Sequence, residues 1–210
     1  RALRVRPRAG ELVVAVVPSF GLHWLLPRLP QFQALHPEHR VRLQASLEVQ
    51  DLRQGAAQLA IRMGHGPWDG LAQRHLFDDE LLMVASPCLN GGALPRTPAD
   101  VLACTPIRSA EPWAPWCRAA GLPDPPPARG LWINDSNLSL DAARLGQGVA
   151  LERRSVADGL LRRGELVALT ELRVPYAYPC WVVWPESSAS APRDDFVRWL
   201  EAAVAAYRSA

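Results

Sequence analysis

The sequence has no lysine, few cysteines and no long hydrophobic run. All 23 basic residues of the 210-residue chain are arginines, and 21 acidic residues nearly balance them, leaving a net charge of +2. A domain that binds nucleic acid directly usually carries a concentrated basic face. The one dense basic run, Arg1, Arg4, Arg6 and Arg8, lies at the start of the chain and is typical of a solvated tail. The composition therefore argues against direct nucleic-acid binding by these residues.

Other absences argue against further classes of protein. The four cysteines, Cys88, Cys104, Cys117 and Cys180, are scattered and show no spacing typical of a zinc site, so we expect reduced thiols, a cytoplasmic location and no bound metal. An uninterrupted run of about 18 apolar residues, which a membrane-spanning helix needs, is missing. The motifs of serine hydrolases, zinc proteases and phosphate-binding loops are missing too. The sequence accordingly predicts neither an enzyme nor a cofactor.

The first pattern that is present joins a buried strand to a helix. Residues 12–17 are continuously apolar, as expected of a strand covered on both faces. Five apolar residues then recur at helical spacing and predict a helix over residues 21–35 that faces its own sheet: Leu22, Leu25, Leu26, Leu29 and Phe32. On a regular α-helical wheel, Trp24 and Leu35 fall outside this stripe, with Arg28 beside them. Ser19 lies at the seam, where it can cap the helix or bind a ligand.

Strands and helices alternate along the rest of the chain. Apolar runs predict strands at 40–46, 59–64, 72–77, 80–86, 149–153 and 180–184, with helices at 138–148 and 194–208. This alternation predicts βαβ units and a largely parallel sheet. The composition changes near 86–90 and near 170–176, which predicts two lobes joined by two crossings. Lobe I would comprise residues 12–88 and 174–210, and lobe II residues 89–173.

Four segments together carry a resemblance to a known family: "VVPSFGLHWLLPRLPQFQALHP", "DLRQGAAQLAIRMGHGPWDGL", "DDELLMVASP" and "DSNLSLDAARLGQGVALERR". The chain resembles, over residues 10–207, the effector-binding domain of LysR-type transcriptional regulators, especially the glycine-cleavage activators and β-lactamase regulators. The resemblance implies an α/β fold with two Rossmann-like lobes joined by two crossover strands, similar to type 2 periplasmic binding proteins.

The same resemblance implies a function and its partners. The chain would sense a small-molecule effector, anionic or zwitterionic, and would dimerise; the full-length regulator would be a tetramer. DNA would be reached only through a winged-helix domain ahead of this chain, with residues 1–11 as the end of the linker to it. No membrane is implied. A periplasmic-type solute-binding protein of the same fold remains the alternative, followed by a small enzyme, because a fold alone does not separate these functions.

The candidate effector-binding residues come from both lobes. They are Ser19, Phe20, Arg62, Met63, Gly64, Arg108, Asp135, Ser136 and Tyr178. Arg62 ends a strand beside the expected crevice and offers a planar fork for a carboxylate. Each of the main candidates also has a structural interpretation: Ser19 and Asp135 as helix caps, Arg62 as the partner of Asp51, and Tyr178 as a packing aromatic.

The resemblance also implies an antiparallel dimer. In it the helix 21–35 would meet residues 138–145 in the second lobe of a partner. The residues expected in this interface are Trp24, Arg28, Leu35, Leu140 and Arg144. The position of Trp24 outside the apolar stripe of its helix is the sequence feature that favours such a contact.

Overall fold

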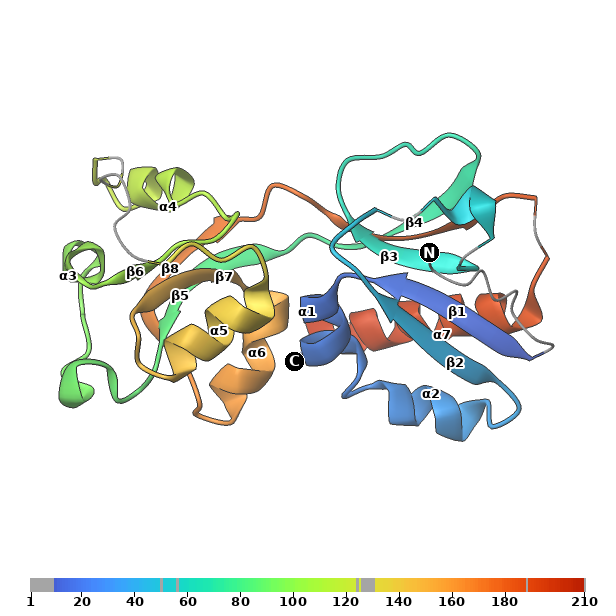
Figure 1. Cartoon of the computed structure of the whole chain (residues 1–210), viewed down its shortest axis with the longest axis horizontal. Coiled ribbons are helices and arrows are strands. Elements are labelled where there is room, and N and C mark those ends of the chain that lie inside the picture. The colour runs from blue at the N-terminus through green and yellow to red at the C-terminus, as the bar shows by residue number, and fades with distance from the viewer. Residues whose placement is uncertain are drawn as a thin grey trace. The chain divides into compact units, whose positions relative to one another are not determined.

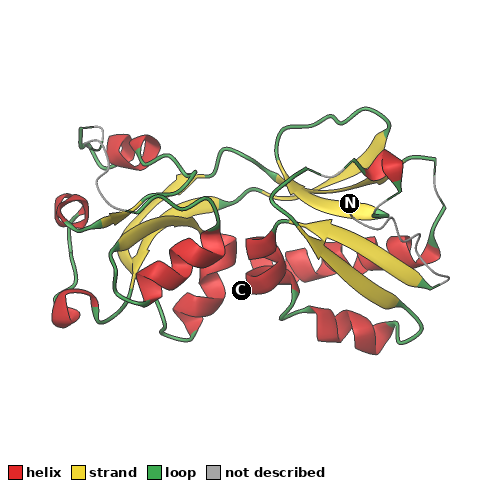
Figure 2. Cartoon of the chain, in the orientation of Figure 1, coloured by secondary structure: helices red, strands yellow, loops and turns green. Residues whose placement is uncertain are grey.

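A computed structural model of the chain describes residues 10–49, 51–55, 57–123, 125, 131–187 and 189–209. Most of the expected linker end, at residues 1–11, therefore lies outside the described residues. The chain divides into two compact units: unit 1 comprises Arg1–Asp78 and Ala177–Ala210, and unit 2 comprises Asp79–Tyr176. Each unit holds its own sheet with helices against it (Figures 1 and 2).

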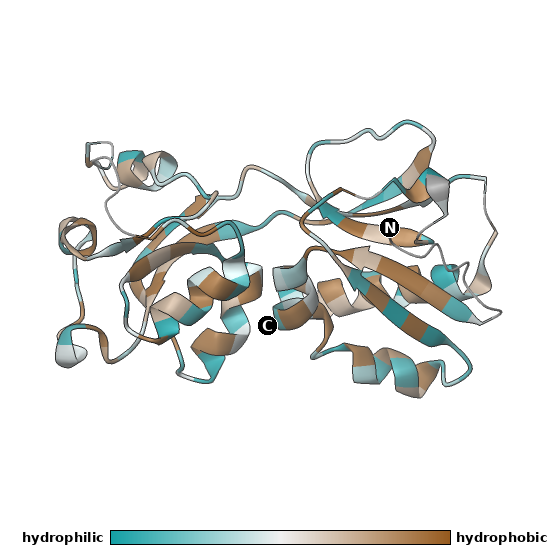
Figure 3. Ribbon diagram, viewed as in Figure 1, coloured by the Kyte–Doolittle hydropathy of each residue, from teal (hydrophilic) through white to brown (hydrophobic). Residues whose placement is uncertain are grey.

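Unit 1 is built on a mixed sheet with the strand order β2-β1-β3-β9-β4. β1 (Glu11–Val16) lies in parallel between β2 (Arg40–Ala45) and β3 (Leu59–Met63), and β9 (Cys180–Pro185) runs antiparallel between β3 and β4 (Leu71–Phe77). Figure 3 shows the apolar stretch of β1 and the alternation along β2. Because β1, β2 and β3 run in parallel, their carboxyl ends meet at one edge, where open α/β sheets bind ligands.

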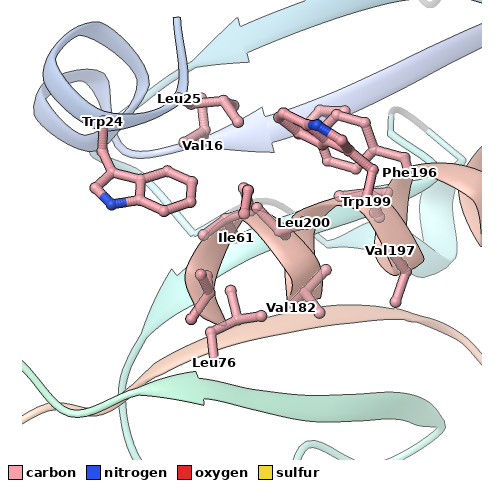
Figure 4. Close-up of a cluster of buried hydrophobic side chains, with 14 of the residues drawn as sticks. Val16, Trp24, Leu25, Ile61, Leu76, Val182, Phe196, Val197, Trp199 and Leu200 are labelled. Atoms are coloured by element: carbon pink, nitrogen blue, oxygen red, sulfur yellow. The ribbon is translucent and has the colours of Figure 1, made fainter. Parts of the chain in front are cut away.

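Helices from both ends of the chain cover one face of this sheet. α1 (Pro18–Phe20) continues into a π-helical turn, η1 (Gly21–Leu25), and α2 (Leu29–Leu35) follows after a turn; α7 (Ala191–Arg208) returns from the far end. Figure 4 shows side chains of α7 gathered with those of β1, β3 and β9 in the resulting core. The opposite face of β1 packs against the short 3-10 helix η2 (Leu52–Gln54) and its surroundings.

The predicted phase of the helix over residues 21–35 is wrong. Trp24 is fully buried and stacks on Phe20 with ring centroids 5.0 Å apart, whereas Leu22 and Leu26 are 48% and 45% exposed. The physical reason is the π turn, in which Leu26 N–H donates to Gly21 O five residues back, at 2.9 Å. Such a widened turn rotates the following side chains away from their places on an α-helical wheel. Trp24 consequently belongs to the core, and Leu22 and Leu26 to the surface.

Unit 2 has a four-stranded sheet with the order β6-β7-β5-β8. β5 (Glu80–Ala85) runs antiparallel to both β7 (Val149–Arg153) and β8 (Val167–Pro175), and β6 (Pro106–Ile107) is parallel to β7. The expectation of a largely parallel sheet is wrong here. Among its helices, α3 (Pro98–Ala103) and α4 (Ala114–Ala119) pack on one face and α5 (Ser136–Arg144) and α6 (Arg154–Arg162) on the other.

The strand β5 does not belong to the lobe to which the sequence assigned it. Lobe I was expected to run to residue 88, but β5 pairs with two strands of unit 2, and the division falls between Asp78 and Asp79. The change of composition near 86–90 marks instead a short turn of 3-10 helix, η3 (Leu89–Gly92), after that strand. Likewise β8 continues to Pro175, and the second division falls between Tyr176 and Ala177. Among the described residues, no helix is both long and apolar enough to cross a membrane.

Candidate functional site

A pocket lies at the edge of unit 1 where the parallel strands end. Its volume is about 150 Å³, and its lining comes from the carboxyl ends of β1, β2 and β3 and from the loops that follow them. A cavity of this size can hold a molecule as large as benzene. Its polar and aromatic lining residues are Gln44, Ser46, Glu48, Arg62, His65 and Trp68. Arg62, Met63 and Gly64, three of the residues expected from the sequence, line it together.

Arg62 brings the positive charge to this pocket. It follows three buried residues of β3 and is itself half-buried, opposite Trp181 of β9. Burial lowers the pKa of the Arg62 guanidinium, and the negative charge of Asp51 acts against that shift. An arginine remains protonated in proteins even after such a shift, because its pKa lies far above neutral pH. The pocket therefore holds a permanent cation with a planar set of N–H donors.

Gly64 is held firmly in the wall of the pocket. Its N–H donates to Pro179 O at 3.1 Å, and its carbonyl accepts from Trp181 Nε1 at 3.0 Å. A Cβ at this position would lie 3.3 Å from the ring of Trp68, closer than most such contacts. The lack of a side chain thus lets the ring of Trp68 pack against the backbone beside Arg62.

The sequence reasoning missed the residues that β2 contributes. Gln44, Ser46 and Glu48 line the pocket, and the side-chain oxygen of Gln44 is buried with no hydrogen-bond partner among the described residues. Ser46 Oγ accepts from Glu48 N at 3.0 Å and shapes this loop. The signal that could have found them is the parallel pairing of β1 and β2, which places both carboxyl ends at one edge. These residues add hydrogen-bond acceptors to a pocket that Arg62 supplies with donors.

Ser19 and Phe20 are placed differently from what the sequence suggested. The cap of α1 is Val17, without a side-chain cap, and Pro18 takes the first helical position, so the capping role expected for Ser19 is wrong. Ser19 is 2% exposed, and Phe20 is fully buried in contact with the rings of Trp24 and Phe77. Neither is among the residues that line the described pocket.

Tyr178 lies next to the pocket. Its ring centroid is 5.5 Å from that of His65, which lines the pocket, and its side chain is 48% exposed. Within unit 1, Tyr178 therefore lies beside His65, which lines the pocket together with Met63 and Gly64.

Unit 2 carries a second polar site, in its interior. Asp79 is 7% exposed; its carboxylate accepts from Ser155 Oγ at 2.5 Å, from Ser155 N at 3.2 Å and from Glu80 N at 2.9 Å. Asp79 is therefore a buried acid, although it follows another acidic residue, Asp78, directly in the sequence. Burial raises the pKa of Asp79, and these hydrogen bonds and the charge of Arg153 act against the shift. The carboxylate also faces the amino end of α6, where a negative charge is stabilising.

Glu152 is the most deeply buried acid of unit 2. It is 0% exposed, and neither carboxylate oxygen makes a hydrogen bond of normal geometry to a described residue. Burial raises the pKa of Glu152 to about 7, although the hydroxyls of Ser139 and Ser136 and the charge of Arg153 act to lower it. The sequence signal was the charged end of an otherwise apolar strand, "VALER".

Arg153 connects these acids. It is 4% exposed, and its Nε lies 3.7 Å from Glu111 Oε1. Burial raises the pKa of Glu111 as well, while the charge of Arg153 lowers it. Three acids, Asp79, Glu111 and Glu152, thus gather around one buried cation.

The remaining expected residues of unit 2 lie at the start of α5 and directly after the strand β6. The capping role of Asp135 is confirmed, since it accepts from Asn137 N at 2.7 Å, and Ser136 follows it as the first helical residue. Arg108 lies 4.3 Å above the ring of Trp113. The structure thus places Asp135 and Ser136 together on one helix end and Arg108 in a cation–π contact.

The interface residues expected on α5 differ in exposure. Leu140 is fully buried in the core of unit 2, so its expected place in an interface is wrong; it faces the sheet because α5 packs there. Arg144 is exposed and pairs with Asp141 at 3.1 Å. The exposed apolar residues of this helix and its end are Leu138 and Leu145.

Comparison with known proteins finds relatives across almost the whole chain. Residues 6–205 match the family described as the LysR substrate binding domain. The chain is 36% identical over 170 residues to the glycine cleavage system transcriptional activator of Escherichia coli (strain K12), covering 80% of this chain and 56% of that protein. It is 40% identical over 160 residues to the HTH-type transcriptional activator AmpR of Pseudomonas aeruginosa, covering 72% and 53%. The chain spans about half the length of these relatives.

Solved structures of LysR-type effector domains have the same fold as this chain. The effector domain of the transcriptional regulator AmpR of Pseudomonas aeruginosa superposes with a TM-score of 0.82 at 32% identity, covering 94% of this chain and 96% of that one. The AmpR effector binding domain from Citrobacter freundii gives a TM-score of 0.82 at 24% identity over 93% and 98%, which supports the fold alone. The predicted α/β fold is confirmed.

Proposed function

The chain belongs to the family of LysR substrate binding domains, and from that premise we propose that it senses a small-molecule effector for a DNA-binding transcription regulator. The resemblance expected from the sequence motifs is confirmed, and the relatives are transcriptional activators, so a periplasmic solute-binding protein is not favoured. Contact with DNA, through a winged-helix domain that precedes this chain, and a cytoplasmic location belong to the proposal for the whole protein. We propose further that the effector is bound and not converted.

The pocket at the edge of the unit 1 sheet carries this proposal. Arg62 offers parallel N–H donors, which suit a carboxylate. The amide oxygen of Gln44 and the carboxylate of Glu48 line the same pocket and are acceptors, which suit an ammonium group. We therefore propose a zwitterionic effector of the amino-acid type, with its carboxylate on Arg62.

The pocket proposal has a direct test. A thermal-shift screen of amino acids and small carboxylates identifies a ligand, since an effector at 100 times its dissociation constant adds about 2.7 kcal/mol to the stability. Calorimetric titration then compares wild type with Arg62→Gln. We expect affinity to fall about 10-fold to 100-fold, because hydrogen bonds to a charged group contribute about 1.5–3 kcal/mol.

Arg74→Gln is the matched control. Arg74 lies on β4 of the same unit and pairs with Glu201 on the surface, outside the pocket lining. Its loss should leave the affinity unchanged. Equal affinity of the wild type and Arg62→Gln for every ligand found would contradict the proposal.

We also propose that the chain forms a homodimer, and the full-length regulator a tetramer. The surface helices offer Leu22, Leu26 and Leu35 with Arg28 in unit 1, and Leu138 and Leu145 with Arg144 in unit 2. An antiparallel pair would use each of these surfaces twice. In this proposed interface, the exposed Leu22 and Leu26 replace Trp24, which is buried. Leu138 and Leu145 likewise replace Leu140, which is buried too. A monomer at every concentration in light scattering would contradict this.

A further inference from the structure

Two histidines and two carboxylates meet at one point of unit 1, outside the pocket lining. His36 ends α2, Glu38 follows in the turn, His39 precedes β2, and Asp195 reaches them from α7. His39 Nε2 lies 2.8 Å and His36 Nδ1 3.8 Å from Asp195 Oδ2. Each of these nitrogens lies 3.5 Å from Glu38 Oε1. One ligand atom from each residue thus lies within 4.8 Å of all the others.

We propose that His36, Glu38, His39 and Asp195 form a binding site for a zinc ion. Zinc takes imidazole nitrogens and carboxylate oxygens at about 2.0–2.2 Å in a tetrahedral arrangement, whose ligand atoms are then about 3.3–3.5 Å apart. The nitrogen–oxygen distances of 3.5, 3.5 and 3.8 Å already lie near that value. The fourth, 2.8 Å, is that of a hydrogen bond between His39 and Asp195, which an ion replacing the shared proton would lengthen.

The imidazole rings are fixed before any ion arrives. The ring of His36 packs against that of Phe32 with centroids 4.9 Å apart, and the rings of His36 and His39 stack at 5.5 Å and 9°. The side chain of His39 is 9% exposed and that of His36 26%. Rings held in this way lose little conformational freedom on binding.

Asp195 is oriented from its other side. Its Oδ1 accepts from Arg198 on the same helix, and its Oδ2 faces the two histidines. A metal-binding carboxylate is commonly positioned by such an outer hydrogen bond. With Glu38, it supplies two negative charges, which balance the charge of a divalent ion.

A bound ion would connect distant parts of unit 1. His39 and Asp195 are 156 positions apart in the sequence. Zinc would hold the turn between α2 and β2 to α7, and because the four ligands converge only in the folded chain, it would stabilise that fold.

The purified chain, stripped with a chelator, tests the proposal with Co²⁺ and Zn²⁺. We expect one equivalent of Co²⁺ to give the visible bands of a tetrahedral nitrogen–oxygen site, Zn²⁺ to displace it, and Zn²⁺ to raise the thermal midpoint. The Glu38→Gln variant should bind Zn²⁺ at least about 10-fold more weakly in calorimetry. Its side chain is 60% exposed, so the fold should not suffer.

Asp78→Asn is the matched control, because it removes an acid that pairs with a single histidine, His75, at 2.9 Å. It should bind Zn²⁺ as the wild type does. A wild-type chain that takes up no Zn²⁺, or equal binding by the wild type and Glu38→Gln, would overturn the proposal. So would the intense near-ultraviolet absorption of cobalt–thiolate bonds, which would place the metal on cysteines.

Discussion

The two units bury different kinds of side chain. In unit 1 the core is aromatic, with Trp24, Phe32 and Phe196 at 0% exposure, and among the described residues Arg193 is its only buried charged side chain. In unit 2 two acids and one base, Asp79, Glu152 and Arg153, are all below 9% exposed. Both units nonetheless have the same plan of a sheet with helices against it.

Because of this difference, we expect different changes to affect the stability of the two units. A buried charge costs free energy unless it is paired, and it makes stability depend on pH. Apolar packing instead makes stability depend on shape and volume. Unit 1 should therefore respond most to truncation of its core, and unit 2 to the protonation of its acids.

The largest effect is expected in the aromatic core of unit 1. Trp24→Ala should lower the free energy of unfolding by about 3–5 kcal/mol, because it removes a buried ring and leaves a cavity. Urea unfolding measures this, with Leu35→Ala on the neighbouring helix as the control. Leu35 is 62% exposed, so its truncation should change stability by less than about 0.5 kcal/mol. Equal effects of the two changes would show that Trp24 lies outside the core.

The next effect concerns pH and unit 2. The pKa of Glu152 is raised from 4.5 to about 7, so between these values the folded chain holds a proton that the unfolded chain has lost. The stability that this proton contributes is fully present below pH 4.5 and falls as pH rises, by about 3 kcal/mol once pH exceeds 7. Glu152→Gln should remove this loss and be the more stable variant at pH 8.

Unfolding free energies of the wild type and Glu152→Gln across pH 5–8 test this. Asp79 and Glu111, whose pKa values burial also raises, should leave a residual slope of the same sign. Glu171→Gln, at an exposed position of β8, should keep the full slope of the wild type. A Glu152→Gln profile that parallels the wild type would contradict the burial argument.

The smallest effect compares one helix cap in each unit. Thr97 and Asp100 form a reciprocal capping box on α3 of unit 2, with Thr97 Oγ1 accepting at 3.2 Å. Ser190 caps α7 of unit 1 with one longer bond, at 3.4 Å to Arg193 N. Thr97→Ala should cost about 1 kcal/mol and Ser190→Ala less, by urea unfolding. Thr97→Ser should retain most of the stability, and a larger loss for Ser190→Ala would reverse the comparison.

Sequence alone determined the local elements and the family. The apolar run of β1, the alternation of β2 and the presence of a helix at α5 could be read directly, because each depends on neighbouring residues. The end of that helix was expected at residue 148, but α5 ends at Arg144, two residues before Gly146. Gly146 has a φ of 77°, which favours glycine after a helix. Arg62, Met63 and Gly64 were placed correctly at a strand end for the same reason.

Tertiary structure alone decided how distant segments combine. A regular α-helical wheel does not predict the π turn that buries Trp24. Composition does not show that β5 pairs with β7 and β8. Gln44 joins Arg62, and His39 joins Asp195, only because parallel strands and a returning helix bring them together. Local periodicity reports which face of an element is buried, but the partner of that face is set by contacts between residues far apart in the chain.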